Sequence, residues 1–135
     1  MGNTVDTGSA APAVADTKIE HSISPGLSQR LSQMNVSLAF TSYQSGLLYL
    51  VGTTPNGGVN IHQTALPKPM GLCTNAQGSL VVSCDSQILH FENALAPEER
   101  INDVFDACFI PREVRITGRL DVHDVGLEKD VAWSL

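Results

Sequence analysis

The sequence predicts an all-β fold, built as an antiparallel meander of short strands behind a short helix. From Asn35 onward, short apolar segments repeat at even spacing, and several of them alternate apolar with polar residues. Turn-forming runs separate these segments, such as "TTPNGG" at 53–58 and "NAQGS" at 75–79. The connections over residues 35–91 are too short for the crossover helix that a parallel sheet requires.

The N-terminal region is expected to form a disordered leader and then the short helix. Residues 1–23 are mostly small or polar and show no periodicity. Ser24-Pro25 then places an N-capping residue before a proline at the first helical position. A helix over about 25–34 is predicted, packing across an end of the sheet structure, because three apolar residues follow at helical spacing. These residues are Leu27, Leu31 and Met34.

The strands of the domain, which is expected to span residues 24–135, follow the apolar segments. The expected strands are 36–42, 46–52, 59–66, 80–84 and 87–91. The next stretch is looser, and it predicts a helical turn over 94–100 and a strand over 104–110. Clear alternation returns over 113–126, and a last strand begins at Val131.

The last segment, "VAWSL" at 131–135, has no charged residue or proline after Asp130 to protect a strand edge. One interpretation is that this strand closes a small sheet by pairing with an early strand. The interpretation we favour is that the domain is truncated at its C-terminal side.

Composition limits the classes of function. Apolar residues make up 42% of the chain and charged residues 16%, which permits a packed core. The net charge of -6 argues against nucleic-acid binding and against docking on anionic membranes. Cys73, Cys84 and Cys108 form no CxxC pair, so we expect free, buried thiols in a reducing compartment. Without a secretion signal or a long apolar run, the expected location is the cytoplasm.

Four segments carry a resemblance to a known family. They are "FTSYQSGLLYLVG" (40–52), "PMGLC" (69–73), "FENALAP" (91–97) and "FDACFIPREVRITGRLDVHDVG" (105–126). Over residues 35–128 the chain resembles the N-terminal part of a longer bacterial family of conserved hypothetical proteins, of unknown function, with β-propeller-like repeats. The unit at 69–91 is also similar to a blade of the NHL and gluconolactonase type. At roughly 40–45 residues per blade, the resemblance implies about two blades of a β-propeller.

The segment 114–124 contains most of the candidate binding residues. If it forms one uninterrupted strand, Arg115, Arg119, Asp121 and His123 share a face. The two arginines suit a carboxylate or phosphate, and the other two residues suit proton transfer or ligation. A bulge at Gly118 would separate these side chains. The alternative is a solvated face on which opposite charges pair locally.

Asp124 is a candidate through the blade resemblance. "HDVG" at 123–126 occupies the place that "MGLC" at 70–73 holds in the preceding unit. Because inner propeller strands begin near the channel, the resemblance implies that His123 or Asp124 points toward the axis. Two adjacent residues cannot form a metal site alone, so neither a metal nor another cofactor is expected.

Two functions and a third possibility remain open. The favoured one is a non-catalytic module that binds a small molecule or a protein, because no catalytic motif is present. The alternative is a metal-dependent lactonase or hydrolase of the kind that similar propellers support, and the third possibility is an inactive fragment of either. In an open two-blade piece, unpaired sheet edges are expected to drive self-association.

Overall fold

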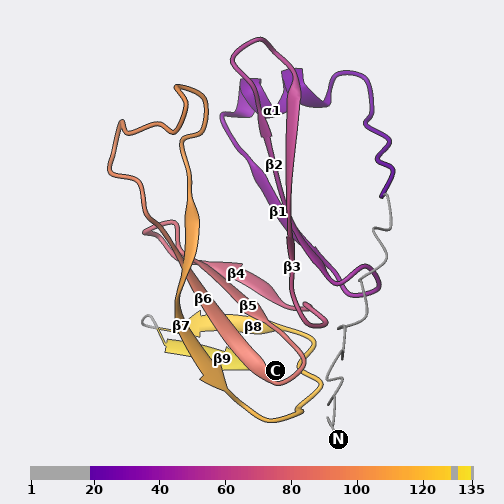
Figure 1. Cartoon of the computed structure of the whole chain (residues 1–135), viewed down its shortest axis with the longest axis vertical. Coiled ribbons are helices and arrows are strands. Elements are labelled where there is room, and N and C mark those ends of the chain that lie inside the picture. The colour runs from indigo at the N-terminus through magenta and orange to yellow at the C-terminus, as the bar shows by residue number, and fades with distance from the viewer. Residues whose placement is uncertain (1–18, 129–130, 135) are drawn as a thin grey trace, which may run out of the picture.

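The computed structural model describes residues 19–128 and 131–134, so most of the expected leader at 1–23 lies outside the described residues. These parts of the chain contain one helix and nine strands (Figure 1). The elements are α1 (Leu27–Met34), β1 (Leu38–Ser42), β2 (Leu47–Thr53), β3 (Val59–Ala65), β4 (Leu72–Thr74), β5 (Leu80–Ser83), β6 (Gln87–Asn93), β7 (Phe109–Ile116), β8 (Val125–Glu128) and β9 (Val131–Ser134).

The strands form three antiparallel sheets, each in the order of the sequence. The first sheet is β1-β2-β3, the second is β4-β5-β6-β7, and the third is β8-β9. Every pairing joins consecutive strands, which confirms the predicted all-β antiparallel meander with a short helix. The last strand pairs with β8 and not with an early strand.

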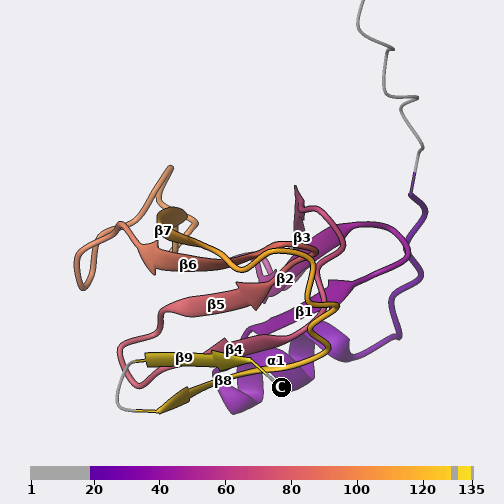
Figure 2. The ribbon, with the colours of Figure 1, turned by 90° about the horizontal axis from the view of Figure 1, so that it is seen from below.

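The second sheet is covered on both faces at β5. All four of its residues, Leu80–Ser83, are buried, although successive side chains of a strand point to opposite faces. Leu80 and Val82 belong to a core shared with Leu48 of the first sheet. Val81 belongs to a smaller core with Val125 of the third sheet. β8 lies beside β4 (Figure 2), so the third sheet covers the face opposite the first.

Helix α1 packs on β2 of the first sheet through Leu31, which is buried. The helix ends as predicted, with Asn35 in the left-handed conformation at φ 52°. Its start differs from the prediction, because Gly26 and not Ser24 occupies the N-cap position. Met34 remains 61% exposed, so only part of the predicted apolar stripe contacts the sheet.

The stretch between β6 and β7 also differs from the prediction. The helical turn expected over 94–100 is reduced to a hydrogen-bonded turn, in which the Glu99 N–H donates to the Ala96 carbonyl. The strand expected over 104–110 begins only at Phe109. Asn102 and Asp103 have positive φ angles and close a tight turn, so the chain there does not extend.

Candidate functional site

The expected face of 114–124 is not formed, because β7 ends at Ile116. Gly118 and Asp121 follow with φ angles of 73° and 50°, and these left-handed residues turn the chain away from the sheet. Arg115 therefore stays on β7, whereas the other four candidate residues lie in the loop 117–124. Alternation alone suggested a longer strand, but the backbone conformation at these two positions interrupts it.

Three segments meet at one end of the second sheet, because β4 and β6 begin there and β5 and β7 end there. They are 66–71, 84–86 and 117–124, and we call this region the loop end. Ser83 fixes two of these segments together. Its hydroxyl accepts a hydrogen bond from the Gly71 N–H at 2.8 Å and lies 3.5 Å from the Val122 carbonyl oxygen.

Gly71 permits a close contact between these segments. A Cβ at this position would lie 2.6 Å from backbone atoms of Asp124 and Val125. Only a glycine therefore lets the chain that leads into β8 pass so near the chain that leads into β4. The segments "MGLC" and "HDVG", which the sequence placed at equivalent positions in successive units, meet at this contact.

A three-residue ion cluster joins all three segments of the loop end. The Arg119 Nε lies 3.4 Å from one carboxylate oxygen of Asp85, and the Lys68 Nζ lies 3.5 Å from the other. The Asp85 side chain is 29% exposed, whereas Arg119 is 75% exposed. The arrangement presents two cationic side chains to solvent around one half-buried carboxylate.

Arg115 belongs to a different ion pair. Its Nε donates to the Glu113 carboxylate on the same strand at 2.6 Å. That hydrogen bond, together with the positive charge of Arg115, lowers the pKa of Glu113. The two arginines expected to hold one anion are therefore bound to different carboxylates.

The remaining candidates show weak mutual contacts. The His123 Nε2 lies 3.7 Å from an Asp121 carboxylate oxygen, and both side chains are largely exposed. Asp124 accepts a hydrogen bond from the next N–H of its own chain, that of Val125, at 2.8 Å. Its charge raises the pKa of the Cys73 thiol, although burial of this thiol is the larger cause. No group of three or more His, Cys, Asp or Glu able to hold a metal occurs in the part of the chain that the structure describes.

Sequence reasoning missed Lys68, Asp85 and Gly71. Lys68 and Asp85 are isolated charges in turns, and no spacing rule connects them with Arg119. Gly71 lies in the Pro-x-Gly turn before β4, and no local pattern indicates that another segment passes against it. The ion cluster and the contact at Gly71 both depend on how the sheets stack, which no local sequence pattern indicates.

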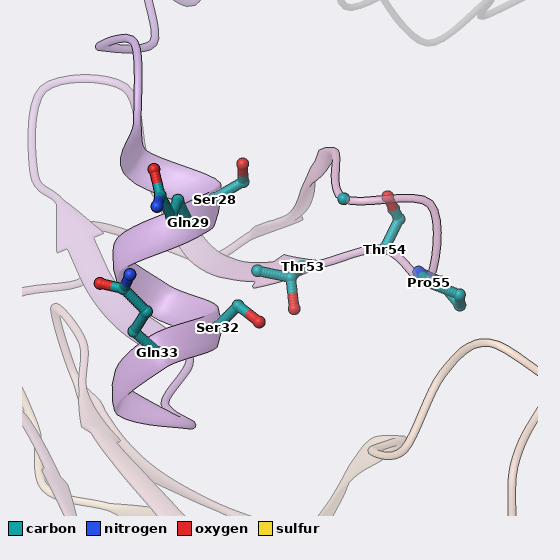
Figure 3. Close-up of a pocket in the computed structure, with 8 residues that line it drawn as sticks. Ser28, Gln29, Ser32, Gln33, Thr53, Thr54 and Pro55 are labelled. Atoms are coloured by element: carbon teal, nitrogen blue, oxygen red, sulfur yellow. The ribbon is translucent and has the colours of Figure 1, made fainter.

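A hollow that the sequence did not predict lies between α1 and the turn that joins β2 to β3 (Figure 3). It has a volume of about 310 Å³ and is lined mainly by hydroxyl and amide side chains, with no charged residue among its lining residues. Ser28, Ser32 and Thr53 line this hollow. It is separate from the loop end.

The fold and the loop end together define the class of protein. It is an all-β chain of stacked antiparallel sheets, with an ion cluster at the loop end. Residues 25–135 match the family described as Domain of unknown function (DUF4915), and the chain belongs to that family. The predicted membership of a family of unknown function is thereby confirmed. No curated protein and no solved structure matches the chain. Among the described residues, no helix is long and apolar enough to cross a membrane.

Proposed function

We propose that this chain is a non-catalytic binding module with propeller-like blades, and that its loop end accepts an anionic group of a small molecule or protein. The observation that carries the proposal is the convergence of Lys68 and Arg119 on Asp85. The blade interpretation is supported by β4 and β8, the first strands of successive sheets, which lie side by side.

The ion cluster retains donors that a ligand can use. An arginine side chain has five N–H donors, and the Arg119 side chain, whose Nε lies 3.4 Å from Asp85, is 75% exposed, so donors remain open to a ligand. The distances of 3.4 and 3.5 Å are long for charge-assisted hydrogen bonds, so neither cation is held tightly. An incoming carboxylate or phosphate can therefore bind both cations while Asp85 keeps them near each other.

The state of the thiols favours binding over cysteine-based catalysis. Burial raises the pKa of Cys84 to about 11, and burial together with Asp124 raises that of Cys73. A nucleophilic cysteine requires the opposite shift. Cys73, Cys84 and Cys108 are free thiols, which supports a reducing compartment, and we propose the cytoplasm.

The test is a titration with inorganic phosphate, followed by backbone amide NMR. We expect resonances of 66–71, 84–86 and 117–124 to shift together, and the Arg119→Ala and Lys68→Ala variants to lose these shifts. Arg115→Ala is the matched control, because it removes a guanidinium bound to Glu113, outside the ion cluster. Equal phosphate shifts in Arg119→Ala and the unaltered protein would contradict the proposal.

The second candidate is a metal-dependent hydrolase, and the proximity of His123 to Asp121 is the observation in its favour. Its test is the change of melting temperature when zinc or manganese is added. A metal-induced rise that disappears in His123→Ala would support the enzyme. An unchanged melting temperature in both proteins would support the binding module.

A further inference from the structure

The free edge of β7 presents backbone groups for pairing. β7 is the last strand of the second sheet, and among the described strands it pairs with β6 alone (Figure 1). The Thr117 N–H donates to the Ser86 carbonyl, so Thr117 is a hydrogen-bonded position of the ladder between β6 and β7. Because hydrogen-bonded positions alternate in an antiparallel pair, Glu113 and Arg115 bond to β6. Val114 and Ile116 therefore direct their N–H and C=O groups outward.

Only the C-terminal half of this edge is open to pairing. A bulge lies where Phe91 pairs with Pro111 and His90 with Glu113, which leaves Arg112 as the extra residue on β7. A bulge and a proline both discourage pairing at a sheet edge. Beyond the bulge the strand is regular, and it exposes apolar side chains, with Val114 at 49% and Ile116 at 78%.

The charges of this half-strand are complementary to themselves. In an antiparallel pair of two β7 strands with Val114 opposite its own copy, Glu113 of each chain faces Arg115 of the other. The outward groups of Val114 form the hydrogen-bonded pair, so the charged residues occupy the non-hydrogen-bonded positions, where side chains lie closest. Glu113 and Arg115 already contact each other along the strand. The four side chains would form a square of alternating charge.

Neighbouring registers lack this complementarity. A shift that puts Arg115 opposite its copy places two guanidinium groups together, and one that centres on Glu113 places two carboxylates together. Arg112 adds no competing charge, because it pairs with Glu92 of β6 at 3.6 Å. We propose that two copies of this chain associate through β7, with Val114 on the two-fold axis, in a weak and reversible dimer.

The experiment compares charge variants of the full chain by sedimentation velocity at increasing concentration. We expect the unaltered protein to dimerise, and we expect E113R and R115E each to raise the dimer Kd about tenfold, because both ion pairs become repulsive. Mixing the two variants is expected to restore dimerisation, since the positive edge of one then faces the negative edge of the other. The double variant E113R/R115E is expected to dimerise like the unaltered protein.

Two further variants separate this edge from other causes. E128R changes the net charge as E113R does but lies at an exposed position of β8 in the third sheet, so its dimer Kd is expected to stay unchanged. V114P removes an outward N–H without breaking the ladder to β6, so a folded monomer is expected, with circular dichroism confirming the fold. A monomeric unaltered protein, a mixture that stays monomeric, or equal dimerisation of E113R would each overturn the proposal.

Discussion

Replacing Gly71 by alanine tests whether the close approach of two chain segments holds the third sheet in place. The added Cβ would lie 2.6 Å from backbone atoms of Asp124 and Val125. The φ angle of Gly71 lies outside the positive range, so backbone strain does not contribute and the effect is steric.

The size of the effect follows from that distance. Carbon atoms in contact lie about 3.5–4.0 Å apart, so the chain entering β8 must move away by about 1 Å. A gap of that size removes a quarter to a half of the dispersion energy at the affected contacts. Val125 is 4% exposed and packs against Val81, so these contacts are the ones weakened. We expect Gly71→Ala to lower the free energy of unfolding by about 2–3 kcal/mol.

Urea unfolding followed by circular dichroism measures this change, and Gly126→Ala is the control. Gly126 lies on β8 itself, but a Cβ there would meet no atom of the described residues within 4 Å. Its stability is therefore expected to stay within about 0.5 kcal/mol of the unaltered protein. If Gly71→Ala is as stable as Gly126→Ala, the two segments do not approach as closely as described, and the reasoning fails.

Three further predictions concern buried or charged groups. Ser83→Ala leaves the Gly71 N–H without its side-chain acceptor and is expected to cost about 1–3 kcal/mol in urea unfolding, and a loss below about 0.5 kcal/mol would contradict this. Cys84, with a pKa of about 11, is roughly one part in a thousand thiolate at pH 8, so mass spectrometry should find it alkylated by iodoacetamide only after unfolding. The lowered pKa of Glu113 stabilises the fold above the ordinary glutamate pKa, and this contribution disappears as the pH falls through the lowered value. Carboxyl NMR titration should show the Glu113 pKa rising in Arg115→Ala, and an unchanged value would exclude the ion pair.

The core strands could be predicted because their signals are local. The strand expected at 46–52 appears as β2 over Leu47–Thr53, and the one at 87–91 as β6 over Gln87–Asn93. In both cases β-forming apolar residues lie between turn residues, and burial in the sheet agrees with that pattern. The segment at 80–84 was predicted only as a strand, and the burial of β5 on both faces was not predicted, because nothing local identifies the covering sheets.

The candidate site could be predicted only in part, because it depends on contacts between distant segments. Arg119 was identified from the sequence, but its partner Asp85 lies in the turn between β5 and β6. The expectation that Arg115 and Arg119 share one face and bind the same anion relied on strand periodicity. The left-handed residues Gly118 and Asp121 interrupt that periodicity. A one-residue change of backbone conformation is enough to move a side chain to another surface.

The contact at Gly71 and the ion cluster are parts of one arrangement. The loop 117–124 begins at the end of β7 and reaches Val122, which lies against Ser83, and Asp124, which lies against Gly71. Arg119 lies between the end of β7 and these two contacts. Its distance from Asp85 therefore depends on the contacts at Ser83 and Gly71. If the Gly71 contact is loosened, Arg119 should lose its fixed position near Lys68. We therefore expect Gly71→Ala to weaken phosphate binding at the loop end more than Gly126→Ala does. Binding is compared without urea, under conditions in which circular dichroism shows both variants to be folded. Equal phosphate binding in the two variants would show that the cluster forms independently of how the sheets stack.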